Sequence, residues 1–151
     1  MVVKNFLPKL RLHTIRRFEL ITLKKRSQFI AMKSGARIHA RAFVLQARRR
    51  KPDETTENLA RFGFTVTKRV GNSVVRNRIK RRLRAAVGQC SSNHTKPDCD
   101  YVLIGKRAAL SEDFTTIVKE LRKSLDRSGT VGANPDNKSG KENSLKLEQN
   151  K

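Results

Sequence analysis

The sequence predicts an α/β fold of the two-layer α+β kind, in which a small mixed sheet packs with helices. Two segments alternate apolar and polar residues, two repeat apolar residues every three or four positions, and one short run is apolar throughout. Residues 61–107 place an alternating segment, a periodic segment and the apolar run in succession, which is the order of a βαβ unit. The 151 residues are enough for one domain.

The first elements are a helix and a strand. A short helix is predicted over residues 23–33, and Gly35 follows in the position that commonly ends a helix. Residues 37–48 change to a period of two, which predicts a strand. The apolar side of this strand carries Phe43, Leu45 and Ala47. The polar residues 49–58, with Pro52, predict a loop.

A second strand leads into the most basic helix. Residues 61–69 alternate again, and one face of the strand carries Phe62, Phe64 and Val66. A Gly-Asn-Ser turn follows at residues 71–73, and its Asn or Ser can cap a helix. That helix is expected over residues 73–87, with Gly88 closing it. Its apolar stripe consists of Val75, Ile79, Leu83 and Ala86.

The last elements are a buried strand and a second amphipathic helix. Residues 89–100 predict a polar loop, and the apolar run Tyr101–Gly105 suits a strand buried on both faces. Ser111 is expected to cap the closing helix, with Glu112 and Asp113 in its first turn. The apolar stripe of this helix consists of Phe114, Ile117, Val118, Leu121 and Leu125. From residue 129 the composition predicts a disordered tail.

The charge of the chain points to a polyanionic partner. The 35 Lys and Arg against 13 Asp and Glu give a formal net charge of +22. Residues 1–51 contribute +14, residues 52–110 contribute +7 and residues 111–151 contribute +1. Nucleic acid suits such a charge better than an anionic membrane surface. No run approaches the roughly 20 apolar residues of a membrane helix.

The N-terminal residues do not resemble a secretory signal, because Lys4, Pro8 and Lys9 interrupt their apolar run. An Arg-rich start is also found in organellar transit peptides, but here the basic character continues into the folded region. We therefore expect the protein in the cytoplasm. Two cysteines are too few for a disulfide-dense secreted scaffold.

Catalysis by protein side chains is not expected. General acid–base chemistry needs a positioned titrating pair, and none of the three His residues stands in a local cluster with acids. Cys90, His94 and Cys99 share one loop, but their spacing lacks an obvious fourth zinc ligand. We interpret them as two reduced thiols and a loop histidine, and we expect no metal site.

The strongest functional signal is the stretch from Arg61 to Arg84, which holds nine basic residues. No acid occurs between Asn58 and Pro97. Solvated surfaces normally mix both signs of charge, so an acid-free helix repels itself unless phosphates lie against it. Arginine forks can bind phosphate oxygens in pairs. The helix over residues 73–87 is therefore predicted to bind nucleic acid.

The same stretch resembles the protein subunit of bacterial ribonuclease P. The resemblance rests on an Arg-Asn-Arg core in a helix that follows a Gly-Asn turn, which stands here as KRVGNSVVRNRIKR from Lys68 to Arg81. It extends over residues 20–127, leaving a basic extension (1–19) and a polar tail (128–151) outside it. The resemblance implies a βαβ unit with an unusual left-handed crossover.

The resemblance also implies a function. In that family a large RNA subunit is the catalyst. It removes the 5′ leader from precursor tRNA, with Mg²⁺ held mainly by the RNA and the substrate. The protein is a non-catalytic subunit, one per RNA, that binds the catalytic RNA and the leader and broadens substrate use. The implied partners are thus the ribonuclease P RNA and precursor tRNA, and no membrane.

The family motif assigns residues to two sites. Catalytic-RNA binding falls on Lys68, Arg69, Asn72, Arg76, Asn77, Arg78, Lys80, Arg81 and Arg84. A cleft between the sheet and the first helix is expected to hold the leader, with Phe29, Lys33 and Phe64 in it. Relatives often carry a second Phe four residues after the first; here Lys33, or Met32 in a slipped register, stands near that place. A Phe on a strand is also more often a core residue than a stacking platform.

Three other functions are compatible with these features. A structural ribosomal protein of similar fold would also combine a basic extension with a small α/β domain. A duplex-DNA protein would use the basic helix in the major groove, although this helix offers few base-reading residues besides Asn77. A protein-only nuclease would cleave RNA without an RNA subunit.

Overall fold

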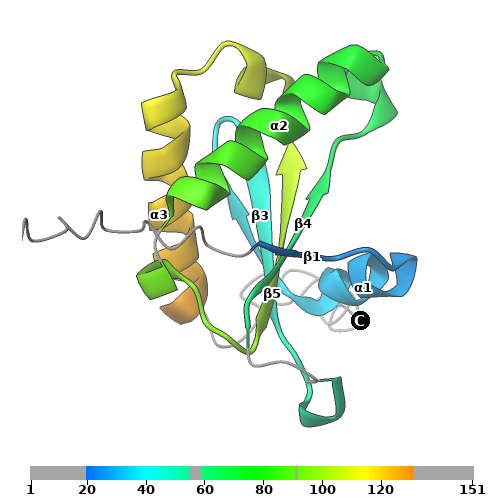
Figure 1. The fold of residues 1–151 in the computed structure, drawn as a ribbon, viewed down its shortest axis with the longest axis vertical. Coiled ribbons are helices and arrows are strands. Elements are labelled where there is room, and N and C mark those ends of the chain that lie inside the picture. Colours follow the sequence, from blue (N-terminus) through cyan, green and yellow to red (C-terminus); the bar gives the residue numbers. More distant parts are fainter. Residues whose placement is uncertain (1–19, 55–58, 91, 131–151) are drawn as a thin grey trace, which may run out of the picture.

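A five-stranded mixed sheet forms the centre of the computed structural model, which describes residues 20–54, 59–90 and 92–130 (Figure 1). The strand order is β1-β4-β5-β3-β2. In that order the strands are Ile21–Thr22, Arg61–Thr65, Cys99–Gly105, Phe43–Arg49 and Ala36–His39. β1 and β5 run parallel to β4, whereas β3 is antiparallel to β5 and β2.

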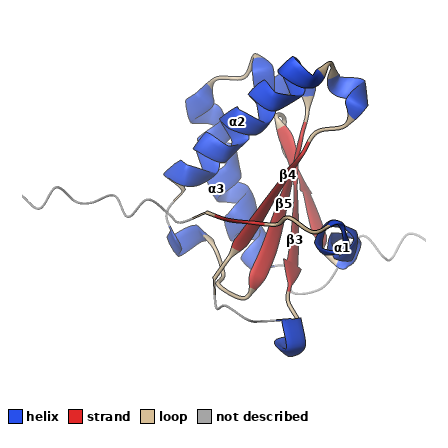
Figure 2. Cartoon of the chain, turned by 45° about the vertical axis from the view of Figure 1, so that its right-hand side comes forward, coloured by secondary structure: helices blue, strands red, loops and turns tan. Residues whose placement is uncertain are grey.

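Helices lie on both faces of this sheet (Figure 2). They are α1 (Arg26–Ala31), α2 (Ser73–Gln89) and α3 (Phe114–Thr130). Short 3-10 turns at Met32–Ser34, Pro52–Glu54, Lys68–Val70, Ser92–His94 and Arg107–Leu110 join the elements. Among the described residues, no helix is long and apolar enough to cross a membrane.

The main core lies between the sheet and the pair α2 and α3. Its largest fully buried side chains are Phe43, Leu45, Phe62, Ile79, Leu83, Tyr101, Leu103, Ile117, Leu121 and Leu125. The rings of Phe62 and Tyr101 stack with their centroids 5.2 Å apart. A Cβ atom at Gly105 would lie 2.5 Å from Cγ2 of Ile79, so α2 approaches the backbone of β5 closely. Each large side chain buried here contributes roughly 1.5–3 kcal/mol.

A smaller cluster lies on the opposite face, under α1. Leu23, Met32 and Val102 are buried in it, and Phe29 and Ile104 pack against them. α1 is only six residues long, and the chain continues from it into the 3-10 turn that contains Met32. The packing of this cluster therefore holds a helix that is too short to be stable by itself.

The structure confirms the predicted α/β class and the succession strand, helix, strand. β4 and β5 are parallel neighbours joined by α2, as in a βαβ unit. The left-handed sense of the crossover stays a prediction from the resemblance. The proposed extension 1–19 and residues 131–151 of the proposed tail lie outside the described residues. The predicted tail boundary at 128 is wrong, because α3 continues to Thr130.

The N-terminal half departs from the prediction in three places. The predicted helix over 23–33 is shorter, and Gly35 follows its 3-10 turn with extended backbone. The predicted strand over 37–48 is two antiparallel strands, closed by a hydrogen bond from the N–H of Ala40 to the carbonyl of Phe43. The apolar positions are even up to Ala42 and odd from Phe43, so the alternation changes phase at this turn, and the single-strand prediction overlooked that change. β1 was not predicted.

The C-terminal half departs at element ends. β4 stops at Thr65, and α2 continues through Gly88 to Gln89. β5 begins at Cys99 instead of Tyr101, which makes it seven residues long. Ser111 ends a 3-10 turn and does not cap α3, which begins at Phe114. Glu112 and Asp113 thus precede the helix, and Thr115 donates a side-chain hydrogen bond to Asp113.

Candidate nucleic-acid interface

α2 is fixed at its start by Asn72 and along its length by the core. The side-chain oxygen of Asn72 accepts a hydrogen bond from the N–H of Val75 at 3.0 Å, which satisfies one free donor of the first turn. The buried residues of the helix are Ile79, Leu83, Ala86 and Val87. Because this stripe faces the sheet and α3, the residues on the opposite side of the helix point outwards.

All nine predicted RNA-binding residues lie on this outward surface or on the turn before it. Lys68, Arg69, Asn72, Asn77, Arg78, Arg81 and Arg84 are exposed, and Arg76 and Lys80 are half-buried. None of the nine forms an ion pair with an acid in the part of the chain that the structure describes. We call these nine residues the α2 surface. No described carboxylate pairs with its seven Lys and Arg side chains, and such side chains suit phosphate oxygens.

Arg82 belongs to the same helix but not to this surface. Its guanidinium donates to the carbonyls of Ala109 and Leu110, the latter at 2.8 Å, and to that of Glu112 at 2.7 Å. These bonds join α2 to the turn that precedes α3. Arg82 therefore holds the fold together, and the six basic residues between Arg76 and Arg84 divide into five that face outwards and one structural residue.

Arg61, the first of the nine basic residues in the stretch 61–84, pairs with an acid and lies outside the α2 surface. It donates two hydrogen bonds of 2.7 Å to the carboxylate of Asp100, which also accepts one of 2.8 Å from the buried Arg50. Burial opposes ionisation of Asp100, but the hydrogen bonds from Arg61 and Arg50 outweigh it and hold its pKa below the ordinary value. The trio joins β4 and β5 to the residue after β3.

The other predicted site begins at Phe29, which is half-buried on α1. A Cβ atom at Gly63 would lie 2.8 Å from Cε1 of this ring, so Phe29 packs directly against the backbone of β4. Met32 is fully buried and Lys33 is exposed. The side chain that reaches the surface near the place of the family's second Phe is thus a cation.

Alternation along the strands adds residues that the sequence reasoning missed. Val44, Gln46 and Arg48 lie on the same face of β3, on the side of α1, and pair with β5 opposite Ile104, Val102 and Asp100. The amide oxygen of Gln46, turned towards β2, accepts two hydrogen bonds of 2.7 Å from Arg37. We call Phe29, Lys33, Arg37, Gln46 and Arg48 the α1 face. The sequence did contain a signal for the β3 residues, because Val44, Gln46 and Arg48 alternate with the core residues Phe43, Leu45 and Ala47.

Phe64 lies elsewhere. It follows Gly63 on β4, so its side chain is on the opposite face of the sheet from Phe29. It packs against the main core, and the guanidinium of Arg84 lies 5.4 Å from its ring centroid. The structure therefore does not bring Phe64 together with Phe29 and Lys33, and places it beside the α2 surface.

The structure does not place Cys90, His94 and Cys99 together in one loop as predicted, because Cys90 caps the end of α2 and Cys99 begins β5. Cys90 and Cys99 are free and buried, and burial raises the pKa of both thiols. His94 lies 2.7 Å from the carboxylate of Asp126 on α3. Within the described ranges, no three His, Cys, Asp or Glu residues gather as metal ligands would.

Comparison with known families identifies the protein family of this chain. The family model described as ribonuclease P matches residues 19–129. The chain belongs to the ribonuclease P protein family. Its role is therefore in ribonuclease P, with a ribonuclease P RNA as partner, and it is part of a ribonuclease.

Relatives and structures agree with this assignment. The ribonuclease P protein component of Gluconacetobacter diazotrophicus is 42% identical over 112 residues, covering 74% of this chain and 93% of that protein. That of Brucella suis is 33% identical over 115 residues, covering 74% and 82%. A Staphylococcus aureus RNase P protein mutant with defective mRNA degradation activity matches with a TM-score of 0.59 and 28% identity, covering 72% of this chain and 87% of that one.

Proposed function

We propose that this protein binds the catalytic RNA of ribonuclease P through the α2 surface and the 5′ leader of precursor tRNA through the α1 face. The complex would then remove the leader and give the mature 5′ end of tRNA in the cytoplasm. The observation that supports the proposal is the α2 surface, where seven Lys or Arg and two Asn side chains lie on one helix and its preceding turn. Structured RNA requires such a dense set of backbone ligands.

The chemistry is assigned to the RNA subunit. Mg²⁺ prefers carboxylate, carbonyl and water oxygens in octahedral geometry. The α2 surface carries guanidinium, ammonium and amide groups, which do not fit a Mg²⁺ ion. We therefore place Mg²⁺ on oxygens of the RNA and the substrate. The protein contributes binding and orientation, and it neutralises phosphate charge where the two RNAs meet.

The α1 face is suited to a single strand. Proteins bind single-stranded RNA by stacking bases on aromatic rings and by pairing the backbone with cations. Phe29 offers a partly exposed ring, and Lys33, Arg37 and Arg48 supply cations around it. One aromatic with three cations favours backbone contacts over the stacking of several bases, so we expect a weak leader sequence preference.

Reconstitution with the cognate RNA subunit tests the proposal. Adding the protein should increase cleavage of precursor tRNA at low Mg²⁺, whereas the protein alone should not cleave. Replacing Arg76 and Arg78 by Ala should weaken RNA-subunit binding. Each lost phosphate contact should also reduce the slope of log affinity against log salt by about 0.7–0.9. No increase in cleavage would refute the function, and an unchanged slope would show that these arginines do not touch phosphate.

A structural ribosomal protein is the alternative class. Family membership argues against it, and sedimentation separates the two directly. A ribosomal protein would be stoichiometric with ribosomes, whereas a ribonuclease P protein should co-purify with an RNA that cleaves precursor tRNA.

A further inference from the structure

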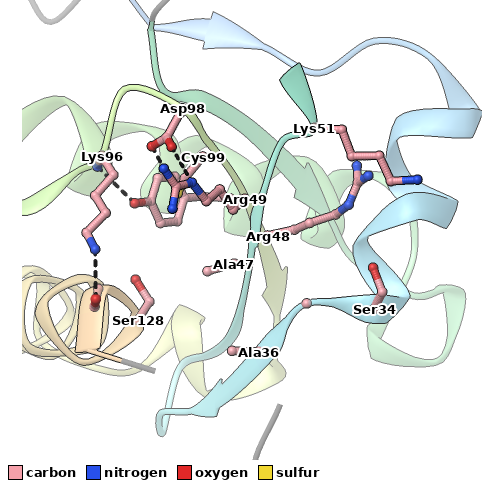
Figure 3. Close-up of a pocket in the computed structure, with 13 residues that line it drawn as sticks. Ser34, Ala36, Ala47, Arg48, Arg49, Lys51, Lys96, Asp98, Cys99 and Ser128 are labelled. Atoms are coloured by element: carbon pink, nitrogen blue, oxygen red, sulfur yellow. Dashed lines mark hydrogen bonds and ion pairs between the residues drawn. The ribbon is translucent and has the colours of Figure 1, made fainter. Parts of the chain in front are cut away.

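A pocket of about 500 Å³ lies along the end of β3, between the turn that follows α1 and the C-terminal end of α3 (Figure 3). β2 pairs with β3 from Ala36 opposite Ala47 to His39 opposite Val44, so residues 48–51 continue past the start of β2. The pocket follows this continuation. A volume of this size accommodates a ligand about as large as one nucleotide, and not a duplex.

Cations dominate the charged lining. Arg48, Arg49, Lys51 and Lys96 line the pocket together with one carboxylate, Asp98. Arg48 and Lys51 lie on the side of Ser34, and Lys96 extends towards Ser128 at the end of α3 (Figure 3). The Arg49 side chain is 82% exposed. Cations from both sides of β3 therefore border the same hollow.

Internal contacts position three of these cations. Arg49 pairs with Asp98 at 2.6 Å and Arg48 with Glu54 at 3.0 Å, while Lys96 donates to the neutral carbonyl of Gly129 at 2.8 Å. Burial opposes ionisation of Asp98, but its hydrogen bond with Arg49 outweighs this and keeps its pKa low. The four cations outnumber the two carboxylates Asp98 and Glu54, so the net charge around the pocket is positive at neutral pH.

The lining favours an RNA backbone over a base. Tyr101 is the aromatic residue in it, but this ring is 1% exposed and stacks on Phe62, so no ring face is open to a base. Guanidinium and ammonium donors without a stacking platform are typical of phosphate contacts, which position a strand and carry no sequence information.

The pocket is continuous with the α1 face. Arg48 follows Gln46 on the same face of β3 and also lines the pocket. Ser34 and Gly35, which follow Lys33, line it as well. A single strand that passes Phe29 and the exposed Arg37 would therefore reach the pocket next.

We propose that this pocket binds the phosphodiester backbone of the 5′ leader where the leader extends beyond the α1 face. The proposal rests on the proposed function and deepens it, because it gives long leaders a contact that short leaders lack. Since the contact is with phosphate, the affinity gained should not depend on the base sequence of the distal leader.

The test uses the reconstituted ribonucleoprotein and two precursor tRNAs, one with a leader of a few nucleotides and one with a long leader. The double variant Lys51→Gln/Lys96→Gln should bind the long-leader substrate several-fold more weakly and with a salt slope lower by about 0.7 per lost contact. Its affinity for the short-leader substrate should equal that of the wild type. Lys119→Gln/Lys123→Gln is the matched control, because it removes the same charge from exposed positions of α3 outside the pocket.

Each contrary result has a distinct meaning. Unchanged long-leader affinity in the pocket variant overturns the pocket proposal, and so does an equal loss for both substrates. Inorganic phosphate that shields Lys51 and Lys96 from amine modification as well as long-leader RNA does would assign the pocket to a small anion. The proposed function is judged separately, since it fails only if wild-type protein does not promote cleavage of either substrate.

Discussion

The ring of Phe29 lies against Gly63, so closely that a Cβ atom on this glycine would stand 2.8 Å from Cε1 of the ring and 3.1 Å from Cγ2 of Val102. The missing side chain on β4 is what allows α1 to present its aromatic residue at this depth. The position of the ring in the proposed leader site therefore depends on a residue that itself offers no group to bind RNA.

Gly63→Ala should displace Phe29 and weaken leader binding about tenfold, because the stacking of one base contributes roughly 1–3 kcal/mol. The measurement is the Kd of the reconstituted complex for precursor tRNA compared with mature tRNA, which has no leader. Gly88→Ala is the control, since a Cβ at Gly88 would meet nothing within 4 Å. Equal Kd values for precursor tRNA in the wild type and Gly63→Ala would remove Phe29 from the leader site.

Arg81 and Arg82 are neighbours on α2 with opposite expected roles. Arg82→Gln should lower the free energy of unfolding by about 2 kcal/mol, because carbonyls near the start of α3 lose a charged donor. Arg81→Gln should change it by less than about 0.5 kcal/mol, as exposed substitutions usually do. Urea denaturation measures both values.

The affinity for the RNA subunit should show the reverse order for these two variants. Arg81→Gln should weaken binding in buffer without urea, where both proteins are folded. If Arg82→Gln weakens binding more than Arg81→Gln while remaining folded, the division of α2 into an outward surface and one structural arginine is wrong.

Asp100 predicts a specific pH dependence of stability. Its pKa in the folded protein lies below the ordinary value of 3.8, so its stabilising effect is complete above that value and is lost as the pH falls through the folded pKa. Asp100→Asn should cost about 3–5 kcal/mol at neutral pH, because Arg50 would remain buried without its carboxylate. The difference between the two proteins should shrink below pH 4; a difference that stays constant into acid would contradict the assignment.

Phe64 should contribute to the fold and to α2, not to the leader site. Phe64→Leu should leave the preference for precursor over mature tRNA unchanged, because its ring is on the opposite sheet face from Phe29. Phe29→Leu serves as the comparison and should reduce that preference. A matching reduction in Phe64→Leu would mean that the leader contacts both faces of the sheet.

The elements that the sequence predicted best are those whose residue pattern is compatible with a single structure. The stripe of Ile79 and Leu83 required a helix, and the absence of acids around it required a polyanion. The hairpin between β2 and β3 was missed because the prediction followed only the apolar residues after position 42 and overlooked the change from even to odd apolar positions between Ala42 and Phe43. The end of the predicted strand at 61–69 was wrong because a 3-10 turn at residues 68–70 leaves no mark on periodicity.

The candidate site divides in the same way. By charge alone, Arg61, Arg81 and Arg82 look the same. The tertiary contacts distinguish them, because Arg61 pairs with Asp100 and Arg82 donates to backbone carbonyls. The alternation of β4 correctly grouped Phe62 with Phe64, yet nothing local showed which sheet face α1 would cover. The pocket at the end of β3 combines residues from separate parts of the chain, so no sequence window contains it.

The close approach at Gly105 has a consequence for the assembled enzyme. A Cβ atom on Gly105 would lie within 3 Å of both Ile79 and Val66. This close packing prevents α2 from sliding along β5. The distance from α2 to the opposite face of the sheet is therefore set by the thickness of the sheet. Under the proposed function, the domain would therefore act as a rigid spacer between the catalytic RNA and the leader. A Gly105→Ala protein that still folds should shift the point at which precursor tRNA is cut, and not merely the rate at which it is cut.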